Sequence, residues 1–168
     1  SRKLALIVLS LCVIQLGCGD HQNNVSRGLE EQILFINNSS EPQDIDPHIT
    51  TGSPESYIIT SLFEGLVRKN PQTLQIEPAM AETWKVNDSA TKFIFHIRKN
   101  ARWSNGDPIT AEDFVVSWQR ILSPKLAAEY AYVLYVINNA EAYNTGKIND
   151  FSQVGVKAID THILEVNL

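Results

Sequence analysis

The sequence predicts a mixed domain of α-helices and β-strands, α/β or α+β, and three observations lead to this class. Runs that alternate apolar and polar residues, such as residues 92–98, are typical of half-buried strands. Other runs, such as residues 57–67, carry apolar residues at helical spacing. Turn-forming clusters such as residues 103–108 separate these runs. Periodicity alone does not decide between α/β and α+β.

The composition is that of an ordinary globular protein, and it excludes several classes. The chain has 168 residues, 43% of them hydrophobic and 20% charged, with a formal net charge of -5. An acidic chain without clustered Lys and Arg does not offer a nucleic-acid surface. Its two cysteines, Cys12 and Cys18, both lie near the N-terminus. The remainder can therefore hold neither a disulfide nor a cysteine-ligated metal.

The start of the chain has the layout of an export signal. Arg2 and Lys3 form a basic pair, residues 4–14 are an apolar run, and Cys18 follows. An apolar helix of that length spans about 16 Å, too short for a hydrocarbon core of about 30 Å. The sequence therefore predicts a cleaved signal peptide over residues 1–17 rather than a permanent membrane span.

Cys18 after Gly17 also resembles a bacterial lipobox, in which the cysteine thiol is acylated and the chain is cut just before it. The resemblance implies a lipid anchor at Cys18, and more than one acyl chain makes such an anchor stable. Gln15 and Leu16 depart from the lipobox pattern, which prefers an aliphatic and a small residue at these positions. The alternative is a secreted protein without an anchor, cut near Gly17 or Gly19.

The first elements of the exported part follow this signal. Behind the anchor cysteine, residues 18–31 are polar, carry no period and indicate a linker. Residues 32–37 favour a short buried strand. A helix is expected over residues 57–67, with Ser53 or Ser56 as its N-cap.

Three further elements are expected in the middle of the chain. Residues 79–84 indicate a helical turn or short helix. Residues 92–98 predict a half-buried strand, and residues 103–108 predict a turn.

The start of the next helix carries a capping signal. Thr110 and Asp113 resemble a capping box, with Asp113 in place of the usual Glu or Gln. They open a helix that runs to about Leu122. Four apolar residues are expected on its buried face: Phe114, Val115, Trp118 and Ile121.

The last third predicts one more helix and two strands. Residues 132–144 favour a helix that ends at the turn signal of residues 144–146. Residues 154–159 and 161–168 are strand-like runs around a tight turn. Because the alternation continues to Leu168 without a cap or tail, we expect that the chain was cut there.

The sequence contains no signature of an active site. GxxxxGK[ST], GxGxxG, HExxH and GxSxG are absent, and the histidines are scattered. His96 and His162 fall in strand patterns, where a solvent-facing histidine is expected. The acidic pair at residues 112–113 suits a helix start, and Asp44 with Asp46 lacks the further oxygen ligands of a calcium loop. We therefore expect that the protein is not an enzyme and that it holds neither a metal nor a cofactor.

Six blocks, in order, resemble the N-terminal third of a bacterial oligopeptide-binding protein, an extracellular solute-binding protein that serves a peptide-importing ABC transporter. They are residues 46–48 (DPH), 61–66 (SLFEGL), 78–84 (PAMAETW), 93–98 (FIFHIR), 101–114 (ARWSNGDPITAEDF) and 117–120 (SWQR). The likeness runs from about Gln32 to Leu168 and implies part of a type II periplasmic-binding-protein-like fold. Residues 32–62 would then form the first segment of lobe I and the crossover to lobe II, and residues 63–168 most of the small lobe II.

Most of these blocks are expected to be scaffold. Large aromatic side chains supply much of the buried area in such a fold. Arg98 is expected to be an ion-pair partner. The aromatic residues expected to be buried are Trp84, Phe93, Phe95, Trp103 and Trp118.

The resemblance places the ligand site elsewhere. In the oligopeptide binders the ligand peptide lies extended in a closed cleft and pairs its backbone with the protein like an added strand. The corresponding segment is Thr51, Gly52 and Ser53, where Gly52 allows close approach and Pro54 ends the extended run. Tyr130 stands where the family places a ligand-contacting tyrosine. The alternatives are a plain loop for the segment and core packing for Tyr130.

The resemblance implies a non-enzymatic carrier, which captures short peptides between two lobes and delivers them to permease subunits in the membrane. The expected location is the periplasm or cell-envelope surface, and the expected state is a monomer. Murein-peptide, dipeptide and nickel-complex binders are alternatives in the same superfamily, and an exported hydrolase or a structural surface lipoprotein lies outside it. The family aspartate that grips the ligand α-amino group would lie beyond Leu168, so we expect this chain alone to bind peptide weakly or not at all.

Overall fold

The computed structural model describes residues 23–168. The predicted signal peptide over residues 1–17 and the predicted lipid anchor at Cys18 lie outside the described residues. The chain divides into two compact units, with the boundary between Ser39 and Ser40. Within the described range, no helix has both the length and the apolar character that a membrane crossing requires.

Helix α2 (Asn24–Glu31) forms within the predicted linker, where the sequence showed no helical period. The side chain of Asn23 accepts a hydrogen bond from the backbone N–H of Ser26 at 2.8 Å, and Arg27 lies 4.0 Å from Glu31 one turn later. An N-cap and an i,i+4 ion pair favour a helix even when no side chain is buried. The linker role of residues 18–31 stays a prediction, and the structure adds that its second half is helical.

The buried strand predicted over residues 32–37 is wrong. Residues 33–38 have no regular secondary structure, and Leu34 and Ile36 are 81% and 79% exposed. A strand depends on a neighbouring strand and on a covered apolar face. Among the described strands, none pairs with these residues.

An antiparallel sheet with the strand order β3-β4-β6-β5 forms the centre of the second unit. β6 lies between β4 and β5, so Phe95 of β4 pairs with Leu164 of β6. This sheet confirms the strands predicted over residues 92–98, 154–159 and 161–168. Its members are β3 (Ala81–Val86), β4 (Lys92–Ile97), β5 (Val156–Asp160) and β6 (Ile163–Asn167).

Strand β3 replaces the helical turn predicted over residues 79–84, and that prediction is wrong. The local composition favours helix, but Trp84 pairs with Phe95 of β4. Such cross-strand contacts outweigh a local preference of a few tenths of a kcal/mol.

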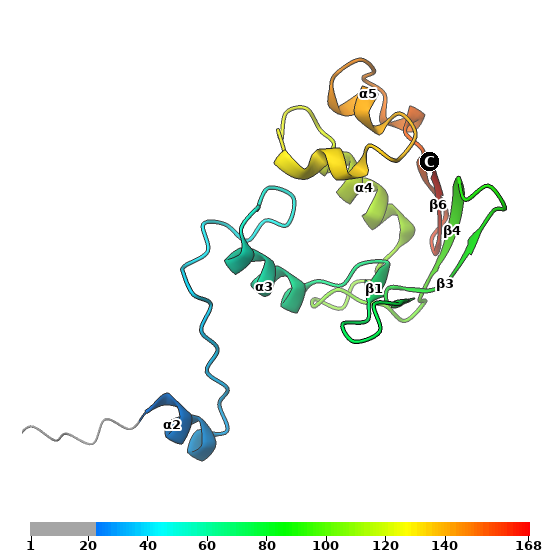
Figure 1. Cartoon of the computed structure of the whole chain (residues 1–168). Helices are drawn as coiled ribbons and strands as arrows, with labels where there is room; N and C mark the ends of the chain where they lie inside the picture. Colours follow the sequence, from blue (N-terminus) through cyan, green and yellow to red (C-terminus); the bar gives the residue numbers. More distant parts are fainter. Residues whose placement is uncertain (1–22) are drawn as a thin grey trace, which may run out of the picture. The chain divides into compact units, whose positions relative to one another are not determined.

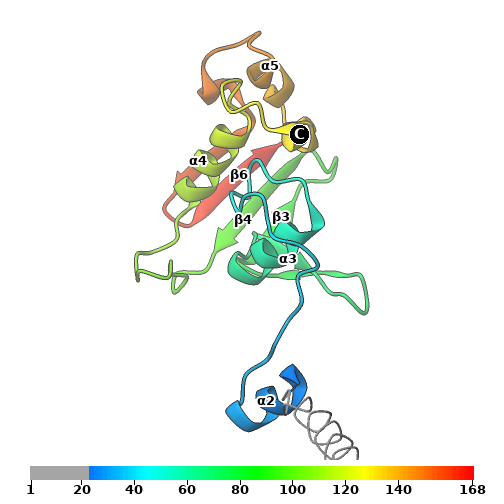
Figure 2. The same cartoon turned by 90° about the vertical axis from the view of Figure 1, so that its left-hand side faces the viewer.

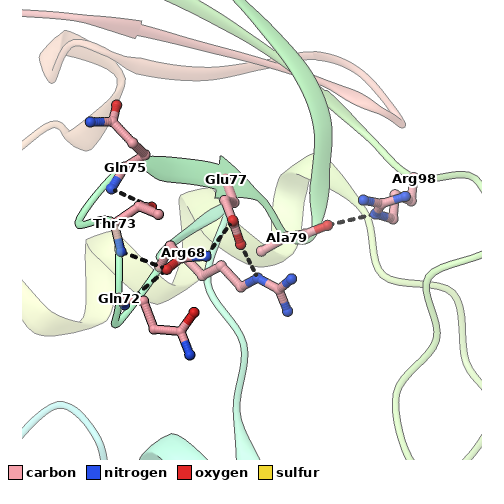
Figure 3. Close-up of polar contacts among 8 residues, drawn as sticks. Arg68, Gln72, Thr73, Gln75, Glu77, Ala79 and Arg98 are labelled. Carbon is pink, nitrogen blue, oxygen red and sulfur yellow. Dashed lines mark hydrogen bonds and ion pairs between the residues drawn. The ribbon is translucent and has the colours of Figure 1, made fainter.

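A two-stranded hairpin of β1 (Val67–Lys69) and β2 (Ile76–Pro78) precedes the sheet. Arg68 and Glu77 form an ion pair across it at 3.2 Å (Figure 3). In the same view, Arg98 donates its Nε to the carbonyl of Ala79 at 2.6 Å. Arg98 forms no ion pair with any described residue. The prediction that Arg98 is an ion-pair partner is therefore wrong. Its bond holds the end of β4 beside the start of β3.

Helix α4 (Ala111–Ile121) covers one face of the sheet (Figure 1, Figure 2). The backbone N–H and the hydroxyl of Thr110 both donate to one carboxylate oxygen of Asp113, at 2.6 and 2.9 Å. The predicted capping-box start is therefore confirmed. The four apolar residues predicted on its buried face all pack against the core, whose largest fully buried side chains are Ile97, Leu122 and Leu164.

The single helix predicted over residues 132–144 is wrong, because the chain forms two shorter helices there. They are the 3-10 helix η2 (Glu129–Leu134) and α5 (Ala140–Asn144). Asn139 has a φ of 61°, which a continuous right-handed helix does not allow. The N–H of Asn138 instead donates to the carbonyl of Asn167 at the end of β6, at 3.0 Å. A 3-10 turn, η3 (Phe151–Gln153), then leads into β5.

The turn predicted over residues 103–108 is confirmed. The N–H of Trp103 donates to the carbonyl of Asp107 at 2.8 Å, and Gly106 has a φ of 93°. Trp103 is 42% exposed in this turn, so its expected burial is wrong. Trp84, Phe93, Phe95 and Trp118 are half-buried.

Candidate functional site

The segment predicted to pair with a ligand lies where a loop meets helix α3 (Ser53–Leu62). The helix begins and ends earlier than the predicted range of residues 57–67. Gly52 is the N-cap residue, and no side-chain hydrogen bond caps the helix. The prediction that Ser53 or Ser56 is the N-cap is therefore wrong. Pro54 lies in the first turn, where its fixed φ suits a helix and its missing N–H leaves no intrahelical bond unmade.

Two backbone groups of this segment are free on the same side. Gly52 is extended, with φ -86° and ψ 153°. In an extended backbone, the N–H and the carbonyl of one residue point to one side of the chain. The carbonyl of the residue before it and the N–H of the residue after it point to the other side, so the carbonyl of Thr51 and the N–H of Ser53 share a side. The carbonyl of Gly52 accepts the N–H of Ser56 at 3.1 Å, whereas those two groups have no hydrogen-bond partner anywhere in residues 23–168. Thr51 and Ser53 are also exposed, so an added strand has a donor and an acceptor within reach.

The loop before this segment is fastened to helix α4. Both terminal nitrogens of Arg120 donate to the carboxylate of Asp46, one of them at 2.9 Å. The same guanidinium lies 2.6 Å from Nδ1 of His48, and Nε2 of His48 lies 2.9 Å from Oγ of Ser117. Ser117 and Arg120 are three positions apart, so they project from neighbouring turns of one helix face.

This network shifts the pKa values of its members. The hydrogen bond from Arg120 lowers the pKa of Asp46 from 3.8 to about 2, and the bond to Asp46 raises the pKa of Arg120. Burial, followed by the nearby positive charge of Arg120, lowers the pKa of His48 below 6.5. Near neutral pH the network therefore contains an ionised Asp46, a charged Arg120 and a neutral His48. The neutral ring has one N–H, which is consistent with Nε2 donating to Ser117 and Nδ1 accepting from Arg120.

Glu55 is a second fastening point, and sequence analysis did not identify it. Its residue is 6% exposed, and its Oε1 accepts the backbone N–H of Gln43 at 2.8 Å. Its Oε2 is buried and has no hydrogen-bond partner in the described chain. A Cβ added at Gly52 would overlap this oxygen. Gly52 thus gives room to Glu55, whereas the sequence suggested that it gives room to a ligand.

Tyr130 lies on η2 and is 46% exposed. It packs edge to face against Tyr132, with ring centroids 6.1 Å apart. No hydrogen bond joins it to Thr51, Gly52 or Ser53 in the part of the chain that the structure describes. Helix α4 holds the loop before residues 51–53 through Arg120 and Ser117, and η2 with Tyr130 follows α4 in the chain.

The remaining candidate residues serve the scaffold. Asp44 accepts the N–H of Asp46 at 2.7 Å, a local turn contact. His96 and His162, expected to face solvent, are half-buried in and beside the sheet. Among the described residues, no group of three or more His, Cys, Asp or Glu side chains could hold a metal ion.

The fold and these sequence blocks match one family of known proteins. The family model described as bacterial extracellular solute-binding proteins, family 5 Middle, matches residues 75–168. The chain belongs to this family.

Periplasmic binding proteins of Escherichia coli share much of the sequence. The periplasmic oligopeptide-binding protein OppA of Escherichia coli (strain K12) is 46% identical over 141 residues, which cover 83% of this chain and 25% of OppA. The probable deoxycholate-binding periplasmic protein YgiS of the same strain is 43% identical, over 82% of this chain and 26% of its own length. The chain thus spans about a quarter of the length of these relatives.

A solved structure of a similar protein supports the same fold. The crystal structure of Haemophilus influenzae OppA in complex with the peptide RPPGFSPFR matches with a TM-score of 0.73 and 41% identity, over 78% of this chain and 26% of that one. The expected mixed α/β, solute-binding-protein architecture is thereby confirmed for the part of that fold which this chain covers.

Proposed function

We propose that this chain is part of the substrate-binding component of a peptide-importing ABC transporter. The complete protein captures short peptides in an extended conformation and delivers them to permease subunits, without catalysing a reaction. Its place is the periplasm or the cell-envelope surface, and it acts as a monomer. Residues 32–62 belong to lobe I and the crossover, and residues 63–168 to lobe II.

One observation carries the proposal beyond family membership. The carbonyl of Thr51 and the N–H of Ser53 are free on one side of an extended backbone, at exposed residues. A peptide added as a strand needs such an alternating pair of acceptor and donor. Backbone pairing recognises any peptide regardless of its side chains, which suits a transporter of mixed peptides.

Tyr130 is proposed as a second ligand contact. Its ring is exposed and held at an angle by Tyr132, so it presents an apolar face and a hydroxyl to solvent. A phenol in this state can pack on a peptide and also bind one of its backbone groups.

Titration calorimetry on the full-length protein tests the proposal. A panel of tri- to pentapeptides is compared with a murein tripeptide, a dipeptide, a nickel complex and deoxycholate, because relatives and superfamily members differ in ligand. We expect submicromolar binding of several peptides with unrelated side chains. Binding of deoxycholate or a nickel complex alone, or hydrolysis of the peptides, would overturn the proposal.

A pair of variants at Ser53 tests the pairing segment directly. Ser53→Pro removes the N–H, but proline is tolerated at the first helical position and after an extended Gly52. We expect it to bind peptides about tenfold more weakly, the loss of one hydrogen bond. Ser53→Ala keeps the N–H and should bind like the wild type. Equal affinity of both variants would show that residue 53 does not pair with the ligand.

Two further parts of the proposal have their own tests. The 168-residue chain by itself is expected to bind peptides weakly or not at all, and submicromolar binding would contradict this. A lipid anchor at Cys18 predicts that the exported protein fractionates with membranes and that Cys18→Ala releases it. The same distribution for wild type and Cys18→Ala would exclude the anchor.

A further inference from the structure

We propose that Glu55 is the positioning residue of the peptide-pairing segment. Its buried carboxylate holds residues 51–53 in the conformation that a ligand strand needs, and this inference rests on the proposed function. Glu55 itself touches no ligand, because it is only 6% exposed. It acts through Gly52 and Gln43.

The carboxylate closes a loop that begins at Gln43 and ends at Gly52. Oε1 accepts the N–H of Gln43 at 2.8 Å, while Oε2 lies so close to Gly52 that no Cβ fits between them. Arg120 and Ser117 hold the middle of the same loop through Asp46 and His48. The loop is therefore held at its centre by α4 and at its start by the bond from Gln43 to Glu55, while Oε2 of the same carboxylate packs against its end at Gly52.

The position of this carboxylate explains why residue 52 is glycine. A side chain at residue 52 would displace Oε2 of Glu55. If Glu55 were exposed, its long side chain could rotate away and make room. Glu55 is buried, and moving it would also break its bond to Gln43. Gly52 keeps φ -86° and ψ 153°, a conformation open to any residue, so the requirement for glycine comes from space and not from backbone strain.

The orientation of Gly52 is what matters for the ligand. Its extended backbone sets the carbonyl of Thr51 and the N–H of Ser53 on one side. If the Gly52 backbone rotates, those two groups no longer face one partner strand. A segment ordered before binding also spares the ligand the entropic cost of ordering it.

The test compares four variants of the full-length protein: Glu55→Ala, Glu55→Gln, Gly52→Ala and the double variant Gly52→Ala with Glu55→Ala. Peptide affinity is measured by calorimetry, the melting temperature by calorimetric scanning, and amide hydrogen exchange of residues 43–50 by mass spectrometry on the ligand-free protein. Glu41→Ala removes an exposed carboxylate from the preceding loop and controls for charge. Leu164→Ala removes a core side chain and controls for stability alone.

We expect Glu55→Ala to bind peptides about tenfold more weakly and to exchange the amides of residues 43–50 faster, beginning with the N–H of Gln43 that Glu55 accepts. Glu55→Gln should stay within about threefold of the wild type, because its amide oxygen can still accept the N–H of Gln43. Gly52→Ala should lose as much affinity as Glu55→Ala. The double variant should bind no more weakly than either single variant, since the overlap no longer exists. Both controls should keep wild-type affinity.

Several results would overturn the inference. They are wild-type affinity in Glu55→Ala, additive losses in the double variant, or a loss in Leu164→Ala as large as in Glu55→Ala. If Glu55→Ala does not fold, Glu55→Gln and Gly52→Ala carry the same comparison.

If the wild type binds no peptide, the proposed function fails, while unchanged amide exchange in Glu55→Ala and Gly52→Ala would refute the positioning role independently.

Discussion

Arg120 binds the carboxylate of Asp46 with both terminal nitrogens, although the two residues are 74 positions apart in the chain. Asp46 lies in the loop before α3, and Arg120 lies in the last turn of α4. A planar guanidinium matches the geometry of a carboxylate in this two-point contact. One side chain of α4 therefore sets the position of the loop that leads to the proposed ligand segment.

We expect Arg120→Lys to loosen this loop although the charge is kept. A lysine ammonium cannot contact both oxygens of Asp46 and Nδ1 of His48 in the same plane. The melting temperature should fall by at least about 2 °C, and hydrogen exchange should rise in residues 46–50. Arg68→Lys, in an exposed ion pair with Glu77, is the matched control and should change neither quantity. Identical behaviour of the two variants would contradict the role of Arg120.

Acidification should destabilise the folded protein through His48 and then through Asp46. The folded-state pKa of His48 lies below 6.5, so its contribution is complete above pH 6.5 and decreases as the pH falls below it. The pKa of Asp46 is lowered from 3.8 to about 2, so its contribution is complete above pH 3.8 and is lost as the pH falls toward 2.

The His48→Asn variant separates these two contributions. Its free energy of unfolding, measured by urea titration at a series of pH values, should depend less on pH below 6.5 than that of the wild type. The Asp46 contribution near pH 3 should remain, because Arg120 is still present. A wild-type slope below pH 6.5 in His48→Asn would rule out His48 as its source.

The capping box of α4 should be worth a measurable share of stability. Thr110→Ala removes one of the two hydrogen bonds to Asp113 and should lower the free energy of unfolding by about 1 kcal/mol. Ser104→Ala, at an exposed turn position, should change it by less than about 0.5 kcal/mol. Chemical denaturation of both variants measures the difference. Equal values would mean that the cap adds nothing.

Leu164 in β6 and Val116 in α4 should differ strongly in how much stability their truncation costs. Leu164 is 0% exposed in the core, so Leu164→Ala should cost about 3 kcal/mol of unfolding free energy. Val116 is 53% exposed, and Val116→Ala should stay within about 0.5 kcal/mol of the wild type. Urea denaturation compares the two. A small effect at Leu164 would place it outside the core.

Ala90 offers a stabilising substitution in the turn between β3 and β4. It has a φ of 53°, a left-handed conformation that is costly for a residue with a Cβ. Ala90→Gly should raise the free energy of unfolding by up to about 1 kcal/mol. Ser89→Gly, at a neighbouring residue without a positive φ, should lower it slightly. A destabilised Ala90→Gly variant would contradict the assigned turn conformation.

Local signals in the sequence were sufficient where an element is stabilised by its own residues or by an adjacent hairpin. The start of α4 depends on Thr110 and Asp113, three positions apart, and the β5–β6 hairpin on alternation around one turn. Prediction was wrong where distant residues decide the outcome. Residues 79–84 favour helix locally, yet pair with β4, and residues 132–144 are interrupted by a bond from Asn138 to Asn167.

The candidate site divides in the same way. Thr51, Gly52, Ser53 and Tyr130 were singled out through a likeness to known binding proteins, and their roles in binding remain predictions. The contacts of Arg120, Ser117 and Glu55 were not identified, although SWQR and PES stand in the sequence. A signal for the first two existed in their spacing of three on one helix, but spacing does not name the partner.

The sequence by itself determined the class of protein, three of the four strands of the central sheet and the start of α4, because family blocks, alternation and caps are properties of nearby residues. Only the tertiary structure decided which residues meet across the fold. It placed Arg120 on Asp46, put the carboxylate of Glu55 against Gly52, and left the backbone groups beside Gly52 unpaired. The physical reason is that a hydrogen bond between distant residues depends on where the whole chain brings them, and no local preference encodes that position.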